Sequence, residues 1–141
     1  MTVEVRVTED LAACLALRRA VFIEEQGVPE ADELDDLDGQ AVHLLALVEG
    51  EPLGSARLLR SGDTGKIGRV CVLAAARGTG LGVALMGKAL EVLAADPALR
   101  RAKLSSQTHA LGFYERLGFV AEGADYLDAG IPHRDMVRAL R

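Results

Sequence analysis

The sequence contains no tryptophan, only two cysteines and no apolar run of about 20 residues, the length that spans a bilayer. We therefore expect no membrane-spanning helix. Cys14 and Cys71 lie in apolar patterns without metal-type spacing, which predicts buried free thiols and no metal site. Residues 3–7 alternate apolar and polar side chains and do not form the apolar centre of a signal peptide, so we expect a cytoplasmic protein.

Clustered positive charge is also scarce. The chain has 16 Lys and Arg against 21 Asp and Glu, and no basic cluster exceeds a pair such as Arg18-Arg19 or Arg100-Arg101. A nucleic-acid-binding protein needs a basic face, so we expect no nucleic-acid partner. What remains is an ordinary globular composition: 141 residues, 50% hydrophobic and 26% charged, which predicts one domain over residues 1–141.

The spacing of apolar residues predicts an alternation of strands and helices, because strands repeat every two residues and helices every 3.6. Residues 24–38 hold eight carboxylates together with Gly27 and Pro29, which predicts a loop or a short irregular helix. The predicted strands are 3–7, 43–48, 53–59, 66–72, 103–106, 119–124 and 133–138, and the predicted helices are 11–22 (capped by Thr8 or Asp10), 81–93 and 110–117.

A glycine-rich segment, Arg77-Gly78-Thr79-Gly80-Leu81-Gly82, leaves a predicted strand and opens a predicted helix. The first N–H groups of a helix are unpaired and the helix dipole is positive there, so the segment predicts an anion site. Glycines admit a phosphate close to the backbone, and Arg77 adds a forked cationic donor. A dinucleotide fingerprint needs a glycine where this chain has Val83, and a Walker A loop needs a hydroxyl residue where it has Ala89. The segment therefore matches neither motif. Glycines that serve only close packing are the structural alternative.

This segment resembles the coenzyme A pyrophosphate loop of the GCN5-related N-acetyltransferases (GNAT). Gln107, Ala110, Tyr114 and the pair Gly118-Phe119 fall in the register of that family's active-site helix, with Gln107 where the family usually has asparagine. Glutamine keeps the amide of asparagine, but its longer side chain places the amide farther from the backbone.

The resemblance covers the whole chain. Residues 21–29, 66–70 and 130–133 with Met136 are similar to the bacterial ElaA/YjcF-type branch. The implied fold class is α/β (α+β), the GNAT fold: a mixed, mostly antiparallel sheet of six to seven strands, helices on both faces, and splayed strands 4 and 5 that admit the cofactor.

The implied function is transfer of an acetyl group from acetyl-coenzyme A to a primary amine by direct attack. Tyr114 is the implied general acid, because a phenol with a pKa near 10 stays protonated at neutral pH. Glu25 is the first candidate for the base, and Glu24, His43 and His133 are its rivals. The expected cofactor-binding residues are Val70, Cys71, Val72, Arg77, Gly78, Thr79, Gly80, Leu81, Gly82, Gln107, Phe113 and Tyr114.

The acceptor is expected to be a small-molecule or peptide amine, in contact with Glu25 and His133. The acidic residues 30–38 favour a cationic acceptor, whereas Arg57 and Arg69 on successive strands could hold a carboxylate. Two alternatives stay open. One is a relative of the acyl-homoserine-lactone synthases with another acyl donor, and the other is a non-catalytic sensor of coenzyme A. Dimers are frequent in the superfamily, so a homodimer is a further expectation.

Overall fold

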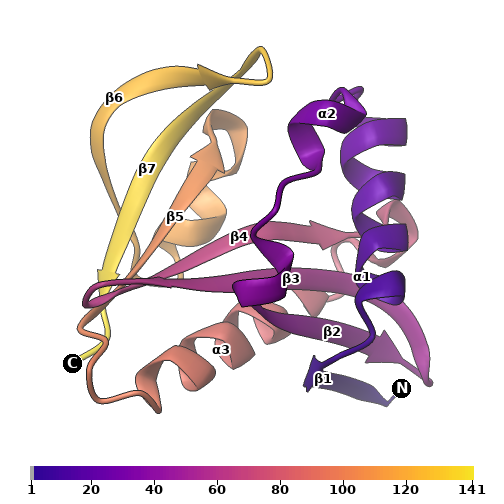
Figure 1. The fold of residues 1–141 in the computed structure, drawn as a ribbon, viewed down its shortest axis with the longest axis horizontal. Helices are drawn as coiled ribbons and strands as arrows, with labels where there is room; N and C mark the ends of the chain where they lie inside the picture. Colours follow the sequence, from indigo (N-terminus) through magenta and orange to yellow (C-terminus); the bar gives the residue numbers. More distant parts are fainter. Residues whose placement is uncertain (1) are drawn as a thin grey trace.

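The computed structural model describes residues 2–141 and shows one twisted sheet with helices packed against it (Figure 1). The strands are β1 (Val3–Thr8), β2 (Val42–Val48), β3 (Glu51–Ser61), β4 (Thr64–Val72), β5 (Arg101–Gln107), β6 (Val120–Asp128) and β7 (Ile131–Ala139). The helices are α1 (Leu11–Arg18), the π-helix η1 (Arg19–Glu25), α2 (Glu30–Glu33), α3 (Leu81–Ala94) and α4 (Leu111–Glu115), with short 3₁₀ turns at η2 (Asp38–Gln40), η3 (Ala74–Ala76) and η4 (Thr108–Ala110).

The seven strands follow the order β1-β2-β3-β4-β5-β7-β6. Every neighbouring pair is antiparallel except β4 and β5, which run parallel. The predicted fold class, a mixed and mostly antiparallel sheet, is confirmed. Most of the strands extend one to four residues beyond their predicted limits, because alternation marks the half-buried centre of a strand better than its exposed ends.

Helices cover both faces of the sheet, as predicted. Successive side chains of a strand point to opposite faces, and β2 shows both environments. Leu44 and Ala46 pack in the cluster that contains the buried face of α3, whereas Leu45 and Leu47 pack with α1. The longer α3 therefore lies across one face and α1 across the other (Figure 1).

The first helix differs from its predicted form. Asp10 caps it by accepting a hydrogen bond from the N–H of Ala13 (3.1 Å), but α-helical geometry ends at Arg18. The chain then continues as a π-helix to Glu25. The helix predicted over 11–22 is therefore present, but its second part has π geometry, because apolar spacing does not distinguish α from π geometry over two turns.

The acidic segment after η1 forms a loop with one helical turn, α2, which begins after Pro29. The predicted loop or short irregular helix is thus confirmed. At the opposite side of the sheet, β6 and β7 meet in a tight turn where Ala129 and Gly130 both have positive φ, of 51° and 76°. Within residues 2–141 no helix is long and apolar enough to cross a membrane.

Candidate active site

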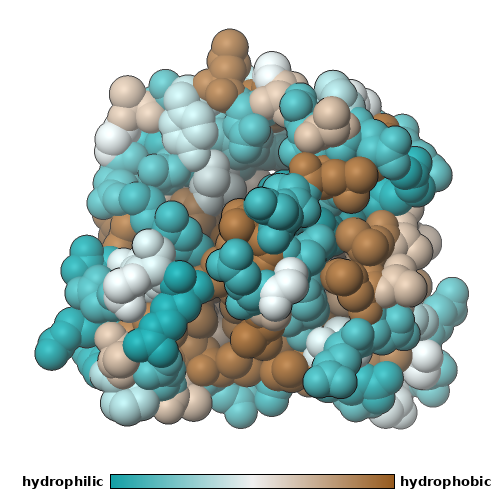
Figure 2. Space-filling view, viewed as in Figure 1, coloured by the Kyte–Doolittle hydropathy of each residue, from teal (hydrophilic) through white to brown (hydrophobic). Residues whose placement is uncertain are grey.

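A cavity of about 710 Å³ opens where β4 and β5 separate. The two strands pair only from Thr64–Ile67 to Arg101–Leu104, and beyond this point each continues without the other. The cavity is lined by the free ends of both strands, by η1 and by the β6–β7 turn. Figure 2 shows this face hollowed between the β6–β7 hairpin and α2, with polar side chains around the opening.

A β-bulge shapes the wall that β4 contributes. Ser55 of β3 pairs with Cys71 and Arg57 pairs with Gly68, so Arg69 and Val70 together oppose one residue of β3. Arg69 has φ of 50°, in the left-handed region that non-glycine residues rarely adopt. The bulge lies directly before residues 70–72, which border the cavity and have no β5 partner. The backbone groups of this wall that point away from β3 therefore have no strand partner.

The glycine-rich segment forms a turn that leads from β4 into α3. Gly78 and Gly80 have φ of 78° and 86°, and a Cβ on either would meet no atom within 4 Å. Conformation, and not close packing, therefore requires glycine at both positions. Gly80 caps α3 without a side-chain hydrogen bond, so the first N–H groups of this 14-residue helix have no side-chain acceptor at the cap.

Two further predicted cofactor residues lie behind the turn. A Cβ on Gly82 would come within 3.3 Å of the Phe113 ring, so these residues pack against each other. Neither residue lines the cavity, and neither do residues 78–81; Arg77 does. Phe113 thus packs against the start of α3.

Arg77 and Glu25 form a salt bridge across the cavity edge. Arg77 Nη2 donates to Glu25 Oε1 (2.7 Å), Nη1 donates to Oε2, and Nε donates to the Val72 carbonyl (3.0 Å). The hydrogen bonds from Arg77 lower the pKa of the Glu25 carboxyl, and the same contact raises the pKa of Arg77. The predicted base and the predicted phosphate ligand therefore neutralise each other in this structure.

Tyr114 lines the cavity from α4, with its ring edge-on to Phe113 (centroids 5.0 Å apart) and to Phe119 (6.1 Å). Burial raises the pKa of its hydroxyl to about 12. The phenol therefore remains a proton donor well above neutral pH.

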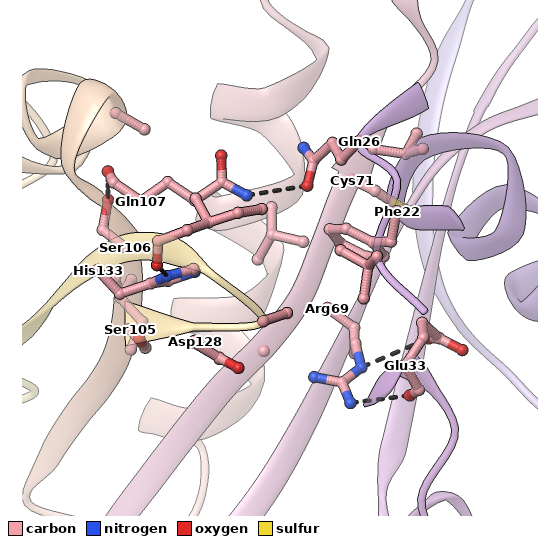
Figure 3. A pocket seen from close by; sticks show the side chains of 18 of the residues that line it. Phe22, Gln26, Glu33, Arg69, Cys71, Ser105, Ser106, Gln107, Asp128 and His133 are labelled. Carbon is pink, nitrogen blue, oxygen red and sulfur yellow. Dashed lines mark hydrogen bonds and ion pairs between the residues drawn. The ribbon is translucent and has the colours of Figure 1, made fainter. Parts of the chain in front are cut away.

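Gln107 lies at the end of β5, and its amide is already engaged (Figure 3). Its Nε2 donates to Gln26 Oε1 of the segment after η1 (2.9 Å), and its Oε1 contacts His109 Nε2 (2.7 Å). The longer side chain thus connects the two walls of the cavity.

The structure places the four candidate bases differently. Glu25 and His133 line the cavity. His133 Nδ1 contacts the Ile131 carbonyl (2.7 Å), which requires the proton on Nδ1 and leaves Nε2 as an acceptor. Glu24 is exposed and outside the cavity lining, and His43 is buried with Nε2 against the Asp38 carbonyl (2.9 Å). The structure therefore does not bring Glu24 and His43 to the site.

Three arginines and three carboxylates form an ion-pair network beside the cavity, on the side where the sequence predicts acceptor binding (hereafter the acceptor side). Arg18 contacts Glu33 and Asp38, and Arg57 contacts Asp35 and Asp38. Arg69 completes the network through Glu33 and Asp35. Half of the acidic segment is thus neutralised internally, which weakens the electrostatic case for a cationic acceptor.

Several residues in or beside the site were not candidates in the sequence analysis. Arg18 occupies an apolar position of its helix, which signals a buried ion pair, and it is 1% exposed. Asp128 reaches the cavity through the β6–β7 turn (Figure 3), and Gln26 through its bond to Gln107. No local pattern marks the last two, because their positions depend on tertiary folding.

Residues 10–140 match the family model described as Acetyltransferase (GNAT) domain. The chain belongs to the GNAT acetyltransferase family. It is 39% identical over 132 residues to the protein ElaA of Escherichia coli, covering 91% of this chain and 86% of that one. It is 37% identical over 131 residues to the protein named "Uncharacterized N-acetyltransferase YjcF" of Bacillus subtilis, covering 92% and 93%. The expected ElaA/YjcF-like branch of the GNAT family is confirmed.

Solved structures agree with this assignment. An acyl-CoA N-acyltransferase from Pseudomonas aeruginosa superposes with a TM-score of 0.85 at 38% identity, over 98% of this chain and 99% of that one. The crystal structure of Escherichia coli ElaA superposes with a TM-score of 0.83 at 32% identity, over 97% and 99%. Membership in this GNAT family supports acyl transfer as the class of chemistry.

Proposed function

We propose that this GNAT protein transfers an acetyl group from acetyl-coenzyme A to a primary amine. The observation that carries the proposal is the continuity of three features: the parted strands β4 and β5, the turn with Gly78 and Gly80, and the uncapped start of α3. A thiol ester on a long arm fits between parted strands, and its pyrophosphate fits the helix start. The N-acyltransferase named above and the N-acetyltransferase name of the Bacillus relative support the same donor and reaction.

Binding would use the chain from Val70 to Gly82. Of the N–H groups of Val70, Cys71 and Val72, those that point away from β3 would pair with the pantetheine arm and polarise the thioester carbonyl, because they border the cavity and lack a β5 partner. The N–H groups from Gly78 to Gly82 would hold the pyrophosphate, and Arg77 would leave Glu25 to join them. Gln107 would fix the walls against which the arm lies, and Phe113 would support the start of α3.

The transfer step needs one acid and one base. The amine nitrogen attacks the thioester carbonyl carbon, the C–N bond forms, and the C–S bond then breaks. Tyr114 donates its phenolic proton to the leaving sulfur and regains a proton from solvent. The proton lost by the amine passes to Glu25 or to His133 Nε2, directly or through water.

The balance between these two bases depends on Arg77. While Arg77 holds Glu25, the pKa of Glu25 is lowered and the carboxylate is a weak base. Transfer of Arg77 to the pyrophosphate would remove this effect and restore the basicity of Glu25. Within residues 2–141 no hydrogen-bond partner is found on His133 Nε2, so it is the base that needs no rearrangement.

Thermal unfolding with acetyl-coenzyme A, coenzyme A, ATP and NAD tests the donor. At a hundred times its dissociation constant a ligand adds about 2.7 kcal/mol to stability, and we expect a rise only with the two coenzyme A species. Gly80→Ala should abolish it, because alanine is strained at φ of 86°. Gly87→Ala in α3, where a Cβ meets open space, is the matched control and should keep it.

Amine screening by thiol release tests the reaction. We expect turnover with at least one class of primary amine. Binding of coenzyme A without turnover on any amine would overturn the transferase proposal in favour of a sensor. No stabilisation by either coenzyme A species would overturn the donor.

A further inference from the structure

Two of the three arginines on the acceptor side, Arg18 and Arg57, donate to carboxylates and do not line the cavity. Arg18 donates from Nε to Glu33 (2.7 Å) and from Nη1 and Nη2 to Asp38 (3.0 and 3.2 Å). Both terminal nitrogens of Arg57 donate to Asp35 (2.8 and 2.9 Å). The two side chains are only 1% and 6% exposed, and neither lines the main cavity. Arg57 is therefore unsuited to the acceptor-binding role expected from the sequence.

Arg69 differs from them because it lines the cavity with unused donors. Its Nη2 donates to the Glu33 carbonyl (2.9 Å), whereas its Nε is buried without a hydrogen bond and lies 3.4 Å from Glu33 Oε1. Its Nη1 has no hydrogen-bond partner within residues 2–141. In Figure 3 this nitrogen points away from Glu33, into the cavity.

The surroundings of Arg69 also disfavour its charged form. Burial, followed by the nearby positive charge of Arg57, lowers the pKa of its guanidinium despite the opposing carboxylates Glu33 and Asp35. An anion in the cavity would relieve this imbalance and gain a charge-assisted hydrogen bond. The pyrophosphate is not that anion in the proposed function, because its proposed site follows Arg77, beyond the C-terminal end of β4.

The opposite wall offers a complementary charge. Asp128 at the β6–β7 turn faces the same space as Arg69 (Figure 3), and no hydrogen bond or ion pair to its carboxylate is found in the described part of the chain. A ligand with one anionic and one amino group could therefore pair with Arg69 on one wall and with Asp128 on the other. Arg69 directly precedes the N–H groups of Val70 and Cys71, so a carboxylate on Arg69 brings the same molecule's amine near the thioester carbonyl.

We propose that Arg69 binds a carboxylate of the acceptor, so that the substrates are amino acids and not simple amines or polyamines. This proposal rests on the proposed function, because it names the acceptor of the same cavity. Asp128 holds the ammonium group until it is deprotonated for attack. The bulge at Arg69 gains a role as well, since a positive φ directs this side chain to the cavity.

The test compares amino acids with their carboxamides as acceptors, by thiol release from acetyl-coenzyme A. The set contains the L-amino acids, β-alanine and 4-aminobutyrate, each against its amide, together with putrescine and spermidine. We expect at least one free acid to exceed its amide about tenfold or more in kcat/KM, since loss of a charged partner leaves buried donors unpaired. The polyamines should react more slowly than that acid.

Variants then assign the preference to Arg69. Arg69→Asn removes the charge while tolerating the left-handed backbone, and it should bring the acid-to-amide ratio near one by slowing the acid alone. Arg69→Lys keeps the charge but loses the fork, and should keep part of the ratio. Arg60→Gln removes an exposed arginine that pairs with Asp96 away from the cavity, and should leave the ratio unchanged.

The outcomes separate this inference from the proposed function. Turnover of amines with an acid-to-amide ratio near one, or faster turnover of polyamines, would overturn the amino-acid class and leave the transferase intact. An equal loss on acid and amide in Arg69→Asn would give Arg69 a structural role only.

If no acceptor turns over, thermal protection of the coenzyme A complex by the same acids decides: protection lost in Arg69→Asn supports the anion site, and no protection rejects it. If neither variant folds, the ratio in the parent protein decides.

Discussion

The two sides of the cavity both contain arginine–carboxylate pairs, but the pairs differ in burial. On the acceptor side, the side chains of Arg18 and Glu33 are 1% and 2% exposed. On the cofactor side, those of Arg77 and Glu25 are 43% and 42% exposed. Removing one partner from the buried pair leaves an unsolvated charge, whereas water or a phosphate can replace either partner of the exposed pair. The buried pair is therefore a fixed support, and the exposed pair is suited to exchange.

The first prediction tests the buried network on the acceptor side. Arg18→Met should destabilise the protein by about 3–5 kcal/mol, because Glu33 and Asp38 lose a shared buried cation. Urea unfolding measures the change. Arg60→Met is the control, and loss of its exposed pair with Asp96 should cost less than about 1 kcal/mol. Equal effects of the two substitutions would mean that the buried network is not a support.

The second prediction concerns chemistry on the exchangeable side. Tyr114→Phe should lower kcat about a hundredfold, within the usual range for a general acid, and should leave the affinity for coenzyme A unchanged. Stopped assays of thiol release and calorimetric titration measure the two quantities. Tyr126→Phe removes the other tyrosine hydroxyl of the chain, outside the cavity lining, and should keep kcat within a few-fold. An unchanged kcat in Tyr114→Phe would remove its assignment as the acid.

The contrast between the two sides also explains what the sequence could predict. The turn from Arg77 to Gly82 is local, so its glycines and their positive φ follow from a contiguous motif. The mixed, mostly antiparallel sheet and the parting of β4 and β5 followed from resemblance. The ends of strands and the π-helix after Arg18 did not, because hydrophobic spacing carries no information on either.

The acceptor side depends on partners distant in the sequence. Arg57 and Arg69 were both candidates for a ligand carboxylate, and nothing on their strands distinguishes them. Only the fold shows that Asp35 and Asp38 occupy Arg57 and leave donors on Arg69. The acidic segment was likewise interpreted as a solvated or substrate-facing loop, although three of its carboxylates face inward to arginines.

The third prediction tests whether the exposed pair of Arg77 and Glu25 exchanges partners. Arg77→Gln should weaken coenzyme A binding about tenfold, since it removes a charge-assisted contact to phosphate. Glu25→Gln should have the opposite sign and strengthen binding a few-fold, because coenzyme A no longer competes with Glu25 for Arg77. Calorimetric titration of each variant measures both changes.

Glu25→Gln together with His133→Gln separates the two candidate bases. If Glu25 is the base, Glu25→Gln lowers kcat while the affinity for coenzyme A is kept or raised. If His133 is the base, kcat stays high in Glu25→Gln and falls in His133→Gln. Weaker coenzyme A binding in Glu25→Gln would contradict the exchange of Arg77 between Glu25 and phosphate.

The smallest expected effect is a pH dependence at the boundary between the two sides. Hydrogen bonds from Arg57 lower the pKa of Asp35 from 3.8 to about 2. A carboxyl with a lowered pKa in the folded state stabilises the fold above its unfolded value, so this contribution is complete above about pH 5 and is lost as the pH falls from about 4 to 2. After allowance for solvent screening of a partly exposed pair, we expect about 1 kcal/mol.

Asp35→Asn should lose that amount of unfolding free energy at pH 7 and flatten the decrease in stability at acid pH, as measured by urea unfolding between pH 7 and 2. Asp36→Asn, in the exposed neighbour, should keep the decrease of the parent protein. An unchanged decrease in Asp35→Asn would show that Arg57 exchanges partners as freely as Arg77 does, and the distinction between a fixed and an exchangeable side would then fail at this residue.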